Sequence, residues 1–347
     1  MNTRDLKYLA AYFLPIGTYF SIIQSGIASF YPLFFAFIML PILEIVFPAR
    51  PNNLTEPEAK SKDNQLFFDI LLYLNIPIIA LLLYTYFTRM PLFHNWIDWV
   101  GNTGSLGLVL SSSGINVAHE LGHKKSKLAR IAAKTLLLPS HYMHFIIEHN
   151  LGHHLNVSTP EDPATSRKGE NVYSFWIRST FKSYISAWTI ENKIQRNNNK
   201  SVFNINNRMI QFTIIHVLYL AVIFLFFSTI GLVAATILGI TSFLVLETIN
   251  YIEHYGLVRK KKANGRYEVV THRHSWNSNH QFGRIMLYEL TRHSDHHYKS
   301  TKKYQLLDSH EDSPELPLGY PGSIVLSLFP PLWFGLMNKR VEFWSTT

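Results

Sequence analysis

Six long apolar segments constrain the fold of this chain more than any other feature of its sequence. A helix of about 20 predominantly apolar residues can cross the ~30 Å hydrocarbon layer of a membrane. The first two segments are almost continuous, as are the last two, so each pair is predicted to form a tight helical hairpin. We therefore predict an all-α, polytopic membrane protein with six transmembrane helices in a single domain, residues 1–347. The predicted spans cover residues 8–26, 27–47, 66–87, 99–118, 209–227 and 230–250.

The distribution of basic residues predicts the orientation of these helices. Membrane proteins concentrate Lys and Arg in their cytoplasmic connections. If the N-terminus is cytoplasmic, only Arg89 of the 32 Lys and Arg residues falls in an outer connection. This orientation predicts that residues 119–208 and 251–347 are cytoplasmic, and it accounts for the net charge of +9 without nucleic-acid binding. We expect a multi-pass protein of the cell inner (plasma) membrane. Its first span is expected to be retained, because no signal-peptide cleavage site ends it.

Histidines gather just beyond the ends of the predicted spans, and the chain contains 17 of them. His119 and His123 are four residues apart, so on a helix they share one face and both rings can reach one metal ion. The same five residues, His-Glu-Leu-Gly-His, match the H-E-x-x-H pattern of zinc proteases. Because unpaired polar groups are expensive at the end of a membrane helix, the position favours a functional site.

Two further clusters repeat this spacing. His149 and His153 are again four residues apart, and His154 is rotated from His153 by about 100° on a helix, which turns it toward a second metal. The third cluster, residues 293–297, has histidines at i, i+3 and i+4, all compatible with one broad helix face. Eight imidazoles exceed what one metal ion accommodates, so the clusters predict two metal ions.

Other histidines and the acidic residues beside the clusters complete the predicted site. His254 follows the sixth span at the same membrane face and is a further candidate ligand, whereas His272 and His274 are predicted to support the site from a loop. Carboxylates next to a metal site accept the second N–H of a bound imidazole and fix its tautomer. The acidic residues beside the candidate ligands are Glu120, Glu148, Glu253 and Asp295.

The residue types limit the metal and the source of electrons. Histidine-only sites suit iron, copper or zinc, and the spacing of the histidines does not choose among them. The chain has no cysteine, which excludes a thiolate zinc site and any cysteine-held iron–sulfur or rubredoxin-type centre within it. If the reaction needs electrons, another protein must deliver them.

Several motifs resemble those of one known family. Residues 119–124, 148–154 and 290–297 are similar to the three histidine boxes of the membrane fatty-acid desaturase and hydroxylase superfamily. The more specific resemblance is to the alkane 1-monooxygenase, or alkane ω-hydroxylase, family. It is carried by Asn-Tyr-Ile-Glu-His-Tyr-Gly-Leu at 250–257, Thr-Pro-Glu-Asp-Pro-Ala-Thr-Ser-Arg at 159–167 and His-Ser-Trp-Asn-Ser-Asn-His at 274–280. The likeness covers nearly the whole chain.

The resemblance implies a non-haem di-iron centre in a cytoplasmic, histidine-rich cap on six transmembrane helices. It implies terminal hydroxylation of medium- to long-chain n-alkanes to 1-alkanols with O₂, and electrons from NADH through an NADH-dependent rubredoxin reductase and a rubredoxin. No catalytic residue beyond the metal centre and no organic cofactor site are expected. His274 and the four acidic residues are expected to support the ligands. The implied iron ligands are His119, His123, His149, His153, His154, His254, His293, His296 and His297.

Alternative functions remain open at this stage. A related membrane di-iron hydroxylase or desaturase would act on fatty acyl or alkyl-aromatic substrates. An intramembrane zinc protease would use Glu120 as its base and would not need His293, His296 or His297. A metal transporter would hold its ligands near the middle of the bilayer. Within the hydroxylase interpretation, an alkane would reach the site from the bilayer, and the Phe- and Ile-rich first two spans are predicted to line its path.

Overall fold

Residues 3–346, which the computed structural model describes, form helices joined by loops and contain no β-strand. Four of these helices are long and apolar enough to cross a membrane, which agrees with the predicted class of helical membrane protein. The four candidate spans are Thr3–Ile23, Gly26–Val46, Leu66–Leu92 and Arg208–His254.

The first two candidate spans form the predicted N-terminal hairpin. Gly26 makes the turn with φ of +70°, a conformation that residues with a Cβ rarely adopt, and its N–H donates to Asp98 Oδ1 at 2.6 Å. The first span consists of η1 (Thr3–Tyr12) and α1 (Phe13–Ile23). The second consists of η2 (Gly26–Phe30), α2 (Tyr31–Phe34), η3 (Phe35–Met39) and α3 (Leu40–Val46). After α4 (Glu56–Asp63), the third span comprises α5 (Leu66–Tyr73), α6 (Asn75–Arg89) and η4 (Met90–Leu92).

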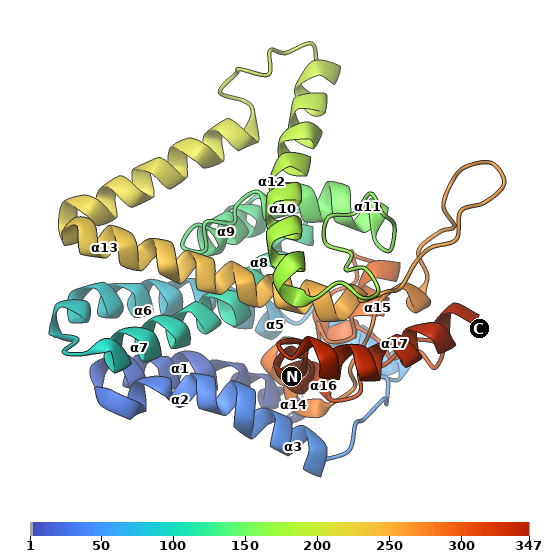
Figure 1. Cartoon of the computed structure of the whole chain (residues 1–347), viewed down its shortest axis with the longest axis horizontal. Coiled ribbons are helices and arrows are strands. Elements are labelled where there is room, and N and C mark those ends of the chain that lie inside the picture. Colours follow the sequence, from blue (N-terminus) through green and yellow to red (C-terminus); the bar gives the residue numbers. More distant parts are fainter. Residues whose placement is uncertain (1–2, 347) are drawn as a thin grey trace.

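The last two predicted spans form one helical element, α13 (Arg208–His254), which folds back on itself. Its backbone breaks at Ser228, where φ is +54° and ψ is −162°, one residue beyond the predicted end of the fifth span. Figure 1 shows the two halves of α13 meeting in a sharp bend at the left of the molecule. The second half ends at His254, beside the other histidine-bearing helices.

The predicted span 99–118 is the one that does not appear among the four apolar helices. Residues 96–123 are continuously helical, as α7 (Trp96–Val109), the π-helical turn η5 (Leu110–Ile115) and α8 (Asn116–His123). Their hydropathy is lowered by polar residues such as Asn102, Thr103 and Ser105, which are all buried. This helix therefore packs against other helices on several sides. Its mean hydropathy is low because its buried polar side chains face protein and not lipid.

The rest of the chain consists of further helices and loops. The apolar stretch before and after Pro330 forms two helices, and Pro330 begins the second one, where a missing N–H costs no hydrogen bond. The elements between α8 and α13 are α9 (Lys127–Leu137), α10 (Phe145–Glu148), η6 (His149–His153), α11 (His154–Asn156) and α12 (Val172–Asn197). After α13 come η7 (His272–His274), α14 (Gln281–Met286), α15 (His293–Tyr298), η8 (Tyr304–Leu306), α16 (Gly319–Ser327) and α17 (Pro330–Thr346).

Buried carboxylates tie the apolar helices to the polar region. Glu44 accepts a hydrogen bond from Gly283 N at 2.8 Å, and Glu247 accepts one from the Tyr142 hydroxyl at 2.6 Å. Both carboxylates face the protein interior, because a carboxylate exposed to lipid would be costly. For the same reason Asp69, which lies within the predicted span 66–87, is expected to face the interior, and this expectation is wrong. Its side chain is 45% exposed and pairs with Lys124, because it lies in the first turn of α5, at the end of the span.

Glu289 connects the N-terminal helix to the loop before α15. Its carboxylate is 3% exposed, accepts a hydrogen bond from the Tyr8 hydroxyl at 2.5 Å and pairs with Arg284 at 2.5 Å. Removing one partner of a buried ion pair leaves an uncompensated charge in a low-dielectric interior. This contact therefore holds the N-terminal hairpin against the loop between α14 and α15.

We predict that Glu289→Gln lowers the free energy of unfolding by roughly 3–5 kcal/mol, because Arg284 is left buried without its counter-ion. Glu56→Gln is the matched control, since Glu56 is 79% exposed in its pair with Lys60 and should leave stability unchanged. Chemical denaturation of both variants in the same detergent measures the difference. Equal stability of the two variants would contradict the structural role of Glu289.

Candidate metal centre

The nine histidines predicted as ligands lie together, although they come from distant parts of the chain. They are carried by α8, by the η6–α11 turn, by the end of α13 and by α15, and Figure 1 shows α11 and α15 near the end of α13. The nitrogens of the nine rings form two groups, and within each group one nitrogen per ring lies within 4.8 Å of all the others. The first group is His119, His123, His149, His154 and His296; the second is His153, His254, His293 and His297.

The first group is centred on His154. Its Nε2 atom lies 3.0 Å from His149 Nε2 and 3.2 Å from His296 Nε2. The ring centroids of His119 and His123 are 4.9 Å apart, so the i, i+4 pair on α8 does face the same point. This group joins three elements: α8, the η6–α11 turn and α15.

The second group lies deeper, and all four of its residues are buried. The Nε2 atom of His297 lies 2.9 Å from His293 Nε2 and 3.2 Å from His153 Nε2. His254 Nε2 lies 3.3 Å from His293 Nε2, so the histidine at the end of α13 closes the group.

The division of the second predicted cluster differs from the expectation. His149 and His153 do not share a group; His149 lies with His154, and His153 belongs to the other group. The reason is the π-helical turn η6, in which His154 N–H bonds to the His149 carbonyl and residues five apart share a face. The third cluster is divided as well, because His296 joins the first group whereas His293 and His297 stay in the second.

The donor geometry fits metal ions. Metal–nitrogen bonds of about 2.1 Å, meeting at octahedral to tetrahedral angles, put two nitrogens on one ion roughly 3.0–3.4 Å apart. The Nε2 contacts of 2.9–3.3 Å agree with that separation. In addition, both ring nitrogens of His119 and the Nε2 atom of His123 are buried without a hydrogen-bond partner among the described residues. A cation shared by the rings would satisfy one nitrogen of each ring, whereas neutral imidazoles alone would not.

Burial keeps the rings in the form that binds metal. It lowers the pKa of His123 to about 4, and it lowers the pKa values of His149, His296 and His297 well below that of a free histidine. Proximity of the other rings lowers them further, since two neighbouring imidazolium ions repel. These four rings are therefore neutral at pH 7, and each presents one lone pair.

Asp162 fixes the tautomer of one ligand, and the sequence analysis did not single it out. Its Oδ2 atom lies 2.9 Å from His153 Nδ1 and accepts from the Thr165 hydroxyl at 2.6 Å, and both Asp162 and His153 are buried. Because Nδ1–H donates to this carboxylate, the lone pair of His153 lies on Nε2, which faces His297 Nε2 at 3.2 Å. Asp162 belongs to the Thr-Pro-Glu-Asp-Pro motif at 159–163, which resembles the family. This motif is the sequence signal that could have identified Asp162 as a partner of a histidine.

The acidic residues expected to support the ligands have different contacts. Glu253 Oε2 lies 3.2 Å from His293 Nε2, and its Oε1 atom accepts from the Tyr320 hydroxyl at 2.8 Å. Glu120 Oε1 accepts from Tyr304 N at 3.3 Å, toward the loop before η8. Glu148 is buried, and its Oε1 atom lies so close to Gly152 that a Cβ there would meet it at 2.7 Å.

His274 and Asp295 face away from the two groups. The His274 ring contacts Glu268 at 3.2 Å and accepts from Thr271 N at 2.9 Å. Asp295 contacts Lys302 at 2.6 Å and His310 Nε2 at 3.0 Å. His272 stacks on His310 with ring centroids 3.5 Å apart. His272, His310 and Asp295 therefore form a cluster separate from the two groups. Stacked rings direct their lone pairs in parallel, which suits a hydrogen-bonded cluster better than a chelate.

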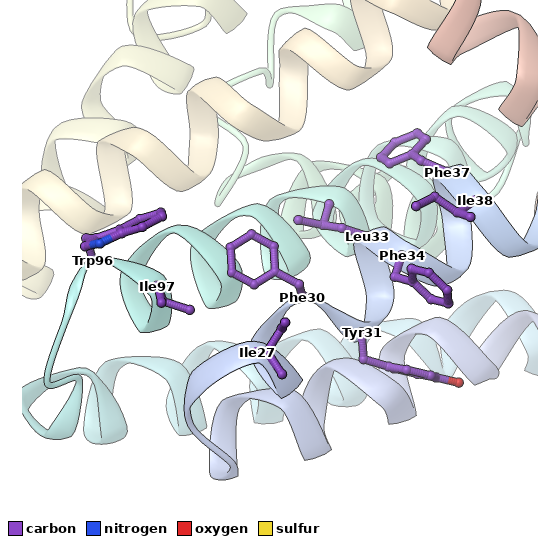
Figure 2. Close-up of a pocket in the computed structure, with 9 residues that line it drawn as sticks. All are labelled: Ile27, Phe30, Tyr31, Leu33, Phe34, Phe37, Ile38, Trp96 and Ile97. Atoms are coloured by element: carbon purple, nitrogen blue, oxygen red, sulfur yellow. The ribbon is translucent and has the colours of Figure 1, made fainter.

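An apolar groove runs along the second candidate span and the start of α7. It has a volume of 820 Å³, and Figure 2 shows Phe30, Leu33 and Phe34 along it, with Trp96 at one end and Phe37 at the other. Most of its lining comes from the second candidate span, one of the two predicted to line the path of an alkane. The groove has almost no polar surface, which suits a hydrocarbon.

A family profile and several known proteins are similar to this chain. A family profile described as fatty acid desaturase matches residues 94–322, which is more than half of the chain. The alkane 1-monooxygenase of Pseudomonas putida is 37% identical over 93% of this chain and 81% of its own length. Alkane 1-monooxygenase 1 of Alcanivorax borkumensis is 36% identical over 95% of this chain and 82% of its own length. The xylene/toluene monooxygenase hydroxylase component of Pseudomonas putida is 28% identical over 87% of this chain and 80% of its own length.

We predict that Asp162→Asn weakens metal binding about tenfold to a hundredfold, because an amide does not hold His153 in the required tautomer. Titration of the metal-free protein with Fe²⁺, followed by metal analysis, measures the change. Asp312→Asn is the control, since the Asp312 side chain is 61% exposed and lies outside both groups. Unchanged metal affinity in Asp162→Asn would show that this hydrogen bond does not orient the ligand.

Proposed function

Since this chain belongs to the alkane 1-monooxygenase family, within the fatty acid desaturase family, we propose that it hydroxylates the terminal methyl group of n-alkanes. The reaction is RCH₃ + O₂ + 2e⁻ + 2H⁺ → RCH₂OH + H₂O. The observation that carries this proposal is the convergence of nine histidines into two adjoining groups, in a chain that has an apolar groove along its second span. The groove favours medium- to long-chain alkanes as substrates.

We propose iron as the metal in both groups, with the nine histidines as its ligands. Histidine-rich sites accept iron, copper and zinc, and O₂-dependent hydroxylation selects a redox-active metal. Two iron ions, when bound, supply the electrons that O₂ cleavage requires. The protein contributes ring positions: Asp162 holds His153, and Glu253 lies beside His293. Burial of these rings excludes water from the site, which protects a reactive oxidant from side reactions.

The membrane arrangement is part of the proposal. The break at Ser228 divides α13 into two halves, and residues 96–123 form a continuous helix, which supports six crossings. The distribution of Lys and Arg supports a cytoplasmic site in the inner membrane. With this topology the histidines lie at the inner leaflet.

We propose a rubredoxin, reduced by an NADH-dependent reductase, as the electron donor. Because the chain has no cysteine, it holds no cysteine-ligated iron centre of its own, which supports an external electron donor. Lys302 and Lys303 are bound to carboxylates, so the exposed Lys125, Lys127 and Arg130 at the start of α9 are better suited to attract an acidic partner.

Hydroxylation of an aromatic methyl group is the second candidate function. Its support is the 28% identity to the xylene/toluene monooxygenase component, and a methylbenzene also fits an apolar groove. The long shape of the groove and the higher identities to alkane monooxygenases favour the alkane. A zinc protease is disfavoured, because His293, His296 and His297 belong to the two groups.

We predict that purified protein with iron, rubredoxin and its reductase converts octane to 1-octanol, and that His149→Ala and His296→Ala each lose bound iron and this product together. Gas chromatography of products from octane, hexadecane and toluene, with metal analysis of each variant, tests this. His94→Ala is the control, because His94 is exposed and belongs to neither group. Full activity in both ligand variants would overturn the assignment of the ligands.

We predict that Phe34→Trp raises the KM for hexadecane more than that for octane, because a larger side chain shortens the groove that a long chain occupies. Ile42→Trp serves as the control, since Ile42 is similarly exposed on the same span but does not line the groove. Steady-state kinetics with both alkanes provide the comparison. An identical effect of the two variants on both substrates would rule out the groove as the alkane site.

A further inference from the structure

A second pocket lies at the polar ends of the first three candidate spans. It has a volume of 610 Å³ and is formed by η1, by the linker that contains α4 and by the start of α14. The lining includes four basic residues, Arg4, Lys7, Arg50 and Lys62, and two acidic residues, Asp5 and Glu58. Neither the metal centre nor the apolar groove shares any residue with this pocket.

The two acidic residues in the pocket are already bound. Asp5 pairs with Lys62 at 2.5 Å, and Glu58 accepts from the backbone N–H of Thr55 at 2.8 Å as the cap of α4. Lys7 Nζ lies 3.7 Å from Glu289, whose carboxylate is held more closely by Tyr8 and Arg284. The lining has four basic and two acidic residues, and this excess of positive charge suits an anionic ligand.

Apolar side chains begin where the pocket ends. Leu6 is 41% exposed, Phe47 is 50% exposed and Leu66 is 68% exposed, and each belongs to or follows directly one of the three spans that meet here. A ligand with a charged head and hydrocarbon chains would contact the cations and these apolar side chains together. A small soluble anion would use only the cations.

We propose that this pocket binds the phosphate headgroup of an anionic phospholipid from the leaflet that borders the metal centre. Phosphate oxygens pair with Lys and Arg, and basic pockets between transmembrane helices commonly hold anionic lipid headgroups. The same face carries the metal centre, because Tyr304, whose N–H contacts Glu120, donates its hydroxyl to the Phe68 carbonyl in α5. The lipid holds η1, the α4 linker and α14 together from outside.

The test measures retention of phosphatidylglycerol by the full chain. Protein purified from nanodiscs of phosphatidylglycerol and phosphatidylcholine is analysed by native mass spectrometry, and the thermal midpoint is recorded with each lipid. We expect Lys7→Gln/Arg50→Gln to bind phosphatidylglycerol about twenty-fivefold more weakly, since each cation near a lipid phosphate contributes roughly fivefold. Phosphatidylglycerol should stabilise the unmodified protein and not this variant.

Lys262→Gln/Arg266→Gln is the matched control, because it removes the same charges from an exposed turn between α13 and η7, in the loop that projects at the upper right of Figure 1. This control variant should retain the lipid. The second control, Lys7→Arg/Arg50→Lys, keeps both charges in the pocket and should also retain the lipid, which tests that substitution alone does not disrupt the pocket. Equal lipid retention in the charge-removed variant and the control overturns the proposal. Stabilisation by inorganic phosphate alone, equal to that by the lipid, overturns it in favour of a soluble anion. Intact lipid binding with slower turnover by an acidic donor protein overturns it in favour of protein docking.

Discussion

The structure depends on holding nine imidazole rings close together in a largely buried site. Burial penalises the imidazolium form, and neighbouring imidazolium ions repel, so rings packed this closely favour the neutral form, which can bind a shared cation. This requirement explains the position of the histidines at the ends of buried helices. It also explains the carboxylate of Asp162, whose hydrogen bond to His153 Nδ1 fixes the tautomer of that ring. A fold that failed to bury these rings would leave them to protonate separately below neutral pH.

The helix from Trp96 to His123 is the support on which the rings are arranged. It contacts η2, α1 and α13, and it buries polar side chains that lipid would not tolerate. Gly101 faces Ser29 and Phe30, and Gly107 faces Thr241, so a Cβ at either position would collide with a neighbouring helix. Small residues of this kind let membrane helices approach closely. His119 and His123 are therefore held by a helix that other helices surround, which limits their movement.

Local sequence was sufficient for some of these features and insufficient for others. The spacing of His119 and His123 placed both rings on one helix face, since an α-helix repeats every 3.6 residues. The same rule misassigned His149 and His153, because a π-helical turn depends on how η6 packs and not on the spacing of its histidines. Hydropathy located the two hairpins. It also selected residues 99–118 as a span, although this segment is not among the four apolar helices and its polar side chains are buried against protein. Asp162 was missed because a carboxylate in a loop becomes recognisable only when its partner, nine residues earlier, is seen beside it.

Two peptide bonds connect the two groups of histidines directly. His153 and His154 are consecutive and belong to different groups, and the same holds for His296 and His297. Consecutive Cα atoms are about 3.8 Å apart, so the distance between the groups is set by covalent geometry at two places. A metal ion bound in one group would therefore restrict the backbone that carries a ring of the other group. The two sites should consequently fill cooperatively, and a half-loaded protein should be a minor species during assembly.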